Sequence, residues 1–201
     1  MDPIVSRAMA KWPNVPAVYG WLALDRRGQW SIKSEPPGGG AQFEPVTNSK
    51  LIDFIGRNYT HDDAGRWYFQ NGPQRVYVTL AYTPLVHRIA QVHPLSFETH
   101  TGVACASLHT ACMDEEGNLL LVTEHGPGLL IDRDLPRGLE ALCYADGHAL
   151  EEERLLDLIE AGSDAAGVYF NTGSASLPLE LMRAQDAPRR WSYVREPRAE
   201  G

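Results

Sequence analysis

Residues 66–78, RWYFQNGPQRVYV, decide the fold, because apolar and polar side chains alternate on both sides of Gly72-Pro73. Glycine at the first central position of a two-residue turn favours a type II′ hairpin, since that position needs a positive φ. In this register one face is predicted to be core: Trp67, Phe69, Val76, Val78 and Leu80. The other face is predicted to point outward: Tyr68, Gln70, Arg75, Tyr77 and Thr79.

The same layout returns in residues 167–179, GVYFNTGSASLPL, where Gly173-Ser174 again begins the turn with glycine. Its inward set is Val168, Phe170, Leu177, Leu179 and Leu181, and its outward set is Tyr169, Asn171, Ser176 and Pro178. A second pair of segments is alike, LALDRRGQWSI (22–32) and ACMDEEGNLLL (111–121). In these segments Asp25 and Asp114 are predicted to open a turn, and Gly28 and Gly117 to take its left-handed position.

Each half also contains a stretch with helical periodicity, residues 48–59 and 151–162. Asn48 or Ser49 is the expected N-cap of the first, and acidic residues open the second. The apolar positions expected to correspond are Leu51, Ile52 and Ile55 in the first stretch and Leu155, Leu156 and Ile159 in the second. A strand-like run follows each later hairpin, LVHRIA (85–90) and WSYVRE (191–196).

These patterns predict an α+β fold made by tandem duplication of a hairpin-helix-hairpin-strand unit, with antiparallel sheets each packed by a helix. The expected repeats are 1–92, which includes a leading helix over 2–11, and the acidic 93–201. Residues 35–45, EPPGGGAQFEP, are expected to form a surface loop.

Composition limits the classes of function. The 201 residues contain 43% apolar side chains, which predicts a folded core, and no apolar run has the length of a membrane span or signal sequence. We therefore expect a cytoplasmic protein without a membrane partner. Three cysteines without CxxC spacing indicate reduced thiols. The net charge of −8, concentrated in the second half, opposes generic coating of nucleic acid.

The outward residues Tyr68, Gln70, Arg75 and Tyr77 are a candidate ligand-binding face. Two aromatic rings beside an arginine and an amide can stack on a flat ligand and hydrogen-bond its edges. The alternative is a solvated sheet face that cross-strand contact between the tyrosines stabilises.

The spacing C-x3-H-x2-C of Cys105, His109 and Cys112 raises the alternative of a metal site. On a strand, however, Cys112 would face away from the other two, and buried thiols explain these residues equally well. The sequence contains no nucleophile elbow, P-loop, dinucleotide-binding glycine motif or HExxH motif. Catalysis therefore has no positive support, and no cofactor is indicated.

KWPNVPAVYGWLALDRRGQW (11–30) together with RWYFQNGPQRVYV resembles an uncharacterised proteobacterial family of unknown function. The pattern Leu24-Asp25-x-x-Gly28-x-Trp30, the segment from Val78 to Val86, and the motif Arg137-Gly138-Leu139-Glu140-Ala141 resemble a second bacterial family of unknown function. This resemblance implies a duplicated fold with a pleckstrin-homology-like second half and a nucleotide-like ligand at the domain interface, in signal transduction. Two of these motifs depart from that family: Ala81, Tyr82 and Thr83 stand where an acidic pair is expected before Pro84, and Leu142 stands where an arginine is expected.

The leading hypothesis is a non-enzymatic ligand-binding or regulatory protein whose nucleotide-like ligand binds between the repeats. Arg137 is the motif arginine that still matches the resembling family and is a candidate ligand contact. Metal binding by Cys105, His109 and Cys112, and a protein interaction module that uses an exposed sheet edge, remain alternatives.

Overall fold

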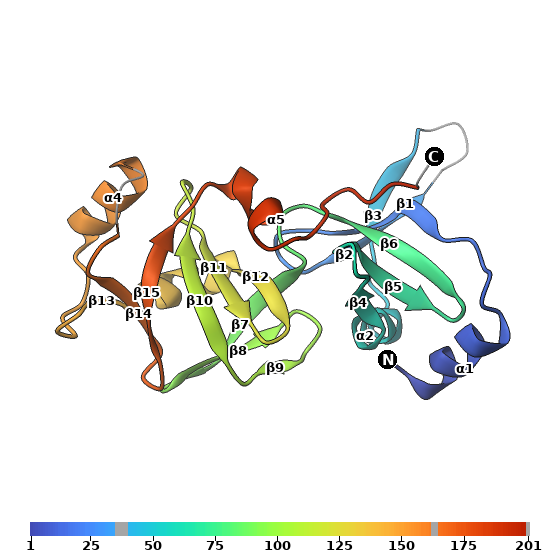
Figure 1. Ribbon diagram of the computed structural model, residues 1–201, viewed down its shortest axis with the longest axis horizontal. Coiled ribbons are helices and arrows are strands. Elements are labelled where there is room, and N and C mark those ends of the chain that lie inside the picture. Colours follow the sequence, from blue (N-terminus) through green and yellow to red (C-terminus); the bar gives the residue numbers. More distant parts are fainter. Residues whose placement is uncertain (35–39, 162–164, 200–201) are drawn as a thin grey trace. The chain divides into compact units, whose positions relative to one another are not determined.

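The computed structural model describes residues 1–34, 40–161 and 165–199, and it has a mixed α+β fold with two sheets and few helices (Figure 1). The chain divides into two compact units, Met1–Pro84 with Ser192–Gly201, and Leu85–Trp191. Strand β7 (Leu85–Val92) pairs with β12 and β8, so it belongs to the second unit. In the described part of the chain, no helix is long and apolar enough to cross a membrane.

The first unit begins with helix α1 (Pro3–Lys11), which confirms the expected leading helix. Its sheet has the order β3-β2-β1-β6-β5-β4. The strands are β1 (Val18–Leu24), β2 (Trp30–Ser34), β3 (Gln42–Pro45), β4 (Tyr59–His61), β5 (Trp67–Asn71) and β6 (Gln74–Leu80). Helix α2 (Ser49–Arg57) precedes β4, and its N-cap is Asn48, whose side chain accepts a hydrogen bond from Leu51 N.

The sheet of the second unit has the order β13-β14-β15-β10-β11-β12-β7-β8-β9. Besides β7, its strands are β8 (Leu95–Thr99), β9 (Ala104–Cys105), β10 (Leu108–Met113), β11 (Leu119–Thr123), β12 (Gly126–Leu130), β13 (Leu142–Tyr144), β14 (Val168–Asn171) and β15 (Ser176–Leu181). The helices are α3 (Leu135–Leu139), α4 (Glu152–Ala161) and α5 (Ala187–Arg190), with 3-10 turns η1 (Asp132–Asp134) and η2 (Ala184–Asp186).

Both sheets are mixed, so the prediction of antiparallel sheets is wrong. Strand β1 pairs with β6, β10 with β15 and β12 with β7 in parallel, and the remaining pairs are antiparallel. The sequence pattern identified hairpins correctly but could not show how hairpins far apart in the chain pair with each other. That pairing depends on non-local contacts, which alternation of side chains does not encode.

Six strands that are adjacent in the sheet have the same arrangement in both units. The order is β3-β2-β1-β6-β5-β4 in the first unit and β12-β11-β10-β15-β14-β13 in the second, so β1 corresponds to β10 and β6 to β15. The register of the parallel pair at the centre is also the same. Leu22 lies opposite Val78 in the first unit, and Ala111 lies opposite Leu179 in the second. The hairpin β1–β2 pairs Leu22 with Ile32, as β10–β11 pairs Ala111 with Leu121.

The predicted aspartate turns are confirmed. Asp25 Oδ1 accepts hydrogen bonds from Arg27 N and Gln29 N, both at 2.8 Å. Asp114 Oδ1 accepts from Glu116 N and Asn118 N, both at 2.9 Å. The glycine that follows three residues later has φ of 76° at Gly28 and 79° at Gly117, so both occupy the left-handed region as the sequence predicted.

The two later hairpins also have the predicted registers. Asn71 pairs with Gln74, which leaves Gly72-Pro73 as the turn, and Gly72 has a φ of 57°. Asn171 pairs with Ser176, and Thr172 N donates to Ala175 O, which leaves Gly173-Ser174 at the centre of the second turn. The aromatic residue predicted to face the core is buried in each hairpin: Phe69 is 6% exposed and Phe170 is 0% exposed.

Three sequence expectations are wrong. Helix α4 follows β13, whereas α2 precedes β4, so the two helices do not occupy equivalent places, and Leu156 is 52% exposed while Leu158 is buried. The run WSYVRE (191–196) is not a strand; within it Val194 makes only an isolated bridge to Arg66. In the expected loop, residues 42–45 form edge strand β3, paired with β2, and residues 35–39 lie outside the described residues.

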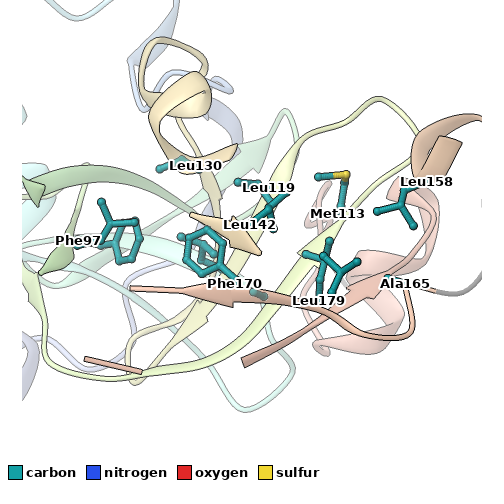
Figure 2. Packing of buried hydrophobic residues seen from close by; sticks show 13 residues of the cluster. Phe97, Met113, Leu119, Leu130, Leu142, Leu158, Ala165, Phe170 and Leu179 are labelled. Carbon is teal, nitrogen blue, oxygen red and sulfur yellow. The ribbon is translucent and has the colours of Figure 1, made fainter. Parts of the chain in front are cut away.

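The core of the second unit is a cluster of buried apolar side chains from most of its sheet and from α4 (Figure 2). Phe97 from β8 lies 6.2 Å from Phe170, measured between ring centroids. Leu158 on α4 closes the cluster at the end occupied by Met113 and Leu179 (Figure 2). Because each of these side chains is nearly inaccessible to water, their burial is the main source of stability in this unit.

The two units differ at one position of the shared register, and this difference gives a test. Leu121 is 0% exposed, whereas Ile32 is 45% exposed. We predict that Leu121→Ala lowers the free energy of unfolding of its unit by about 2–5 kcal/mol because it leaves a cavity in a full core. Ile32→Ala is expected to cost less than about 1 kcal/mol, since it removes a half-exposed side chain. Hydrogen exchange of amides in each unit measures the change in the free energy of unfolding that each substitution causes. Equal changes for Leu121→Ala and Ile32→Ala would contradict the structure.

Candidate functional site

A cavity with a volume of about 640 Å³ lies within the second unit. Four segments form it: the β7–β8 turn with the cis peptide His93-Pro94, the C-terminal part of α3, strand β13 with the residues after it, and the β14–β15 turn. Its lining residues are Val92, His93, Pro94, Leu95, Arg137, Glu140, Ala141, Leu142, Cys143, Gly147, Ala149, Asn171, Thr172, Gly173 and Ser174. This volume is in the usual range of small-molecule sites.

Helix α3 places Arg137 at the cavity. Gly138, the next residue, is buried against the sheet: a Cβ there would lie 2.4 Å from Leu130 Cδ2 and 3.0 Å from Leu119 Cδ1. A Cβ at this position would therefore force Leu130 and Leu119 to shift, which shows that this side of α3 faces the sheet. The side chain of Arg137 is 52% exposed. This packing gives a physical reason for the Arg137-Gly138 pair in the motif that the sequence singled out.

Arg137 has a charged partner at the cavity. Its Nη1 donates to Glu140 Oε2 at 2.5 Å, one turn along the helix. The Glu140 side chain is 62% exposed, and exposed ion pairs of this kind contribute at most about 1 kcal/mol. The guanidinium can therefore exchange this carboxylate for another anion at little cost.

The β14–β15 turn supplies hydroxyl groups. The Thr172 side chain is buried, and its Oγ1 accepts from Ser174 N and Ala175 N. Ser174 Oγ lies 3.1 Å from Thr172 Oγ1. The backbone of the turn is held against the start of β8 because Leu95 N donates to Thr172 O at 2.7 Å. Sequence reasoning identified the turn by its glycine and serines but did not connect it with Arg137.

The structure shows that the expected exposure of the candidate ligand face is wrong for most of its residues. Tyr68 is 6% exposed, Gln70 1% and Tyr77 3%, and Arg75 is half-buried. Both faces of the β5–β6 hairpin are therefore covered. Alternation along a strand distinguishes its two faces but cannot show that other segments of the same unit cover the second face. A ligand contact by these four residues stays a prediction.

Residues of the first unit occupy the faces of these two tyrosine rings. The ring of Tyr19 stacks on Tyr77 with centroids 4.6 Å apart and an interplanar angle of 8°. The guanidinium of Arg75 lies 4.8 Å from the centroid of the Tyr68 ring, and that of Arg66 lies 5.1 Å from Tyr77. A flat ligand would have to displace these contacts before it could stack on either ring.

Asp62 is the anionic centre of this cluster. Tyr77 Oη donates to Asp62 Oδ2 at 2.9 Å and Arg66 Nε donates to the same oxygen at 2.8 Å. Burial acts to raise the pKa of Asp62, but the hydrogen bonds from Arg66 N, Tyr77 and the Arg66 side chain outweigh burial and lower the pKa below 3.8. Burial, followed by the bond to Asp62, raises the pKa of Tyr77.

Cys105, His109 and Cys112 do not converge, and no group of histidine, cysteine and acidic residues in the described ranges could hold a metal ion. Cys112 is fully buried, as expected for a packed thiol, and burial raises its pKa to about 12. His109 Nε2 lies 3.2 Å from Ser107 Oγ. The residues that the spacing brought together in sequence thus have separate local partners in space.

Sequence reasoning did not single out His87, which is 0% exposed on β7. Gly128 leaves room for its ring, since a Cβ at that position would lie 2.3 Å from His87 Nε2. This nitrogen lies 3.2 Å from Leu121 O, which can only accept, so Nε2 carries the hydrogen and Nδ1 accepts from the Cys105 thiol at 3.8 Å. Burial lowers the pKa of His87 to about 4 and raises that of Cys105 to about 11. The pair is therefore neutral near pH 7, and the thiol is not an activated nucleophile.

The Asp62 cluster predicts a dependence of stability on pH. We expect Tyr77→Phe to lower the free energy of unfolding of the first unit by about 1.5–3 kcal/mol at pH 7, because a hydrogen bond to a carboxylate is lost. Because the pKa of Asp62 in the folded state lies below 3.8, the ionised carboxylate contributes its full stabilisation to the folded state above pH 3.8. This contribution disappears as the pH falls through the folded-state pKa. The difference between wild type and variant should therefore shrink below about pH 4.

Thermal unfolding between pH 2 and 7 measures this difference. Tyr169→Phe, on the corresponding hairpin of the second unit, serves as the control variant. A penalty for Tyr77→Phe that is constant over the whole pH range would show that Asp62 does not carry it.

Two solved structures of DUF1285 family proteins resemble the chain. The protein from Silicibacter pomeroyi DSS-3 is 13% identical, with a TM-score of 0.52 over 92% of this chain and 89% of the other. The protein from Shewanella baltica OS155 is 17% identical, with a TM-score of 0.40 over 56% of this chain and 85% of the other. The first likeness shows a shared fold alone. The comparison with curated proteins gave no match.

The family itself is given by a sequence model that covers nearly the whole chain. The DUF2944 model, described as "Protein of unknown function (DUF2946)", matches residues 1–198. The expectation that the chain belongs to a family of unknown function is confirmed, and the protein is a member of this family.

Proposed function

We propose that this protein is a non-enzymatic, ligand-binding regulatory protein that binds a small molecule with a phosphate or carboxylate group in the cavity of its second unit. The single observation that carries the proposal is that Arg137 lines a cavity of about 640 Å³. A guanidinium recognises phosphate and carboxylate groups through two parallel hydrogen bonds, and arginine is the usual residue for this task.

The lining of the cavity suits a nucleotide-like ligand in its mixture of groups. Arg137 and the hydroxyl group of Ser174 offer hydrogen bonds, whereas Pro94, Leu95 and Leu142 offer apolar contact. An anionic ligand would take the place of Glu140 on the guanidinium. Small-molecule sites typically combine an apolar lining with a few polar groups that set the orientation of the ligand.

Binding is favoured over nucleophilic catalysis by the partners of the hydroxyl groups. Among the described residues, Ser174 Oγ shares a hydrogen bond with Thr172 Oγ1 and has no histidine or carboxylate partner. An activated serine or threonine requires a base within hydrogen-bond reach. Cys143 also lines the cavity, but its residue is only 8% exposed.

We also infer that the two six-strand segments arose by duplication of one ancestral unit. The common strand order and the common register of the parallel pair support this inference. After such a duplication, positions that pack the core keep their character and other positions diverge. The pleckstrin-homology-like character of the second half and a role in signalling belong to the same proposal.

Ligand binding is tested by thermal shift with AMP, ATP, cyclic AMP and inorganic phosphate. We expect at least one nucleotide to raise the melting temperature, because a ligand that binds only the folded state stabilises it in proportion to the logarithm of its concentration over Kd. Arg137→Ala should weaken binding about 10- to 100-fold, the loss expected for hydrogen bonds to a charged group. Its own stability should change by less than about 1 kcal/mol.

Arg133→Ala is the matched control, since its side chain is 64% exposed on the adjacent turn η1 and does not line the cavity. Arg137→Lys should restore only part of the affinity, because an ammonium lacks the planar pair of donors. No shift with any of these compounds, or equal shifts for wild type and Arg137→Ala, would refute the proposal.

A further inference from the structure

The first unit contains a cavity of its own, with a volume of about 480 Å³, lined by its sheet and by α2. Strands β1, β5 and β6 contribute Leu22, Phe69 and Val76, and α2 contributes Leu51 and Ile55. We call it the apolar cavity. Its volume is in the range of small-molecule sites.

The apolar cavity lies where the sequence pattern predicts core. Ile32 is an inward position of the β1–β2 hairpin and lines the cavity, yet it is 45% exposed. Leu121, which has the same place in the register of β10–β11, is 0% exposed because the second unit fills this space with its own side chains. The first unit therefore leaves an apolar surface that its own described residues do not cover, and such a surface gains from contact with an apolar occupant.

An irregularity in β1 directs an additional aromatic side chain to the apolar cavity. The register with β6 shifts between Val18 and Leu22, and Gly20 has a φ of 70°. The extra residues allow Trp21 and Leu22, which are neighbours in the strand, both to line the cavity. Bulges of this kind are common beside binding sites because they turn a side chain away from its regular direction.

The lining determines the class of ligand. Nine of its eleven residues are apolar, and none is charged. The two polar residues, Asn71 and Gln74, pair with each other across the β5–β6 hairpin next to its turn, so they mark one end of the cavity. An uncharged amide pair suits a neutral hydrogen-bonding group, and no charged side chain lines the cavity to pair with an ionic one.

We propose that the apolar cavity binds a single aliphatic chain whose uncharged polar end, such as a hydroxyl, ester or amide, contacts Asn71 and Gln74. This site is separate from the cavity that contains Arg137 and does not depend on the proposed function. The bound aliphatic ligand would cover Ile32, Trp21 and Leu51 and complete the core between α2 and the sheet.

The size of the exposed surface argues against a protein partner. Trp21, Ile32 and Leu51 are 44%, 45% and 38% exposed. An aromatic side chain buries roughly 150–250 Å² when it is fully covered, so three side chains that are less than half exposed offer roughly 300 Å² at most. A stable protein interface needs about 800 Å² on each partner.

The test measures binding of dodecan-1-ol by native mass spectrometry and by quenching of tryptophan fluorescence with a bromine-substituted dodecanol. Wild type should bind one molecule. Val76→Phe, which fills the apolar cavity, should weaken binding at least about tenfold, and Val103→Phe is the matched control because Val103 is an exposed valine of the second unit, outside this cavity. Dodecanoate should bind more weakly than dodecanol, since no charged side chain lines the cavity.

If Val76→Phe fails to fold, Leu51→Asp provides the same test. Leu51 is partly exposed near the N-terminus of α2, where a carboxylate is compatible with the helix but repels an alkyl chain. The proposal is overturned if wild type does not bind dodecan-1-ol, or if the variants bind it as tightly as wild type does. Self-association of wild type that Val76→Phe abolishes, without binding of dodecan-1-ol, overturns it in favour of a second copy of the chain.

Discussion

The parallel pairing of the first and last strands in each six-strand segment is the constraint on which the rest of the structure depends. In the first unit it aligns Leu22 with Val78, and in the second it aligns Ala111 with Leu179. Each hairpin on its own would have one bare apolar face and would be marginally stable. The parallel pair joins two hairpins into one sheet, so that their apolar faces become a single surface. A helix or further strands can then cover that surface.

What covers this surface differs between the two units, and the difference accounts for both cavities. In the second unit, strands β7 and β8 and helices α3 and α4 bring apolar side chains such as Phe97 and Leu158 onto it. The additional segments also produce a cavity of mixed polar and apolar lining, where Arg137 on α3 and the β14–β15 turn both contribute lining residues. In the first unit α2 packs against the sheet through the contact of Phe54 with Phe69, and the apolar cavity lies beside this helix. In each unit the proposed binding site is therefore a cavity at the edge of the packed core.

The local structure could be predicted from the order of the residues. The Asp-x-x-Gly turns at Asp25 and Asp114, the glycine-first turns at Gly72 and Gly173, and the N-cap at Asn48 all follow from short-range chemistry, in which a side chain bonds to a nearby backbone group or glycine permits a positive φ. Burial of Phe69 and Phe170 followed from alternation within a hairpin. The motif that contains Arg137 was also recognisable in sequence, although its surroundings were not.

The features that depend on residues far apart in the chain became visible in the folded protein. It showed that β1 pairs with β6 in parallel, that Tyr68 and Tyr77 are covered, and that α4 does not correspond to α2. It separated Cys105 and Cys112 and brought Arg137 and Thr172 to one cavity. Periodicity reports which side of a segment is apolar, but it carries no information about which distant segment lies against that side. Both proposed sites are formed by such distant segments, and for that reason they could not be found from the sequence alone.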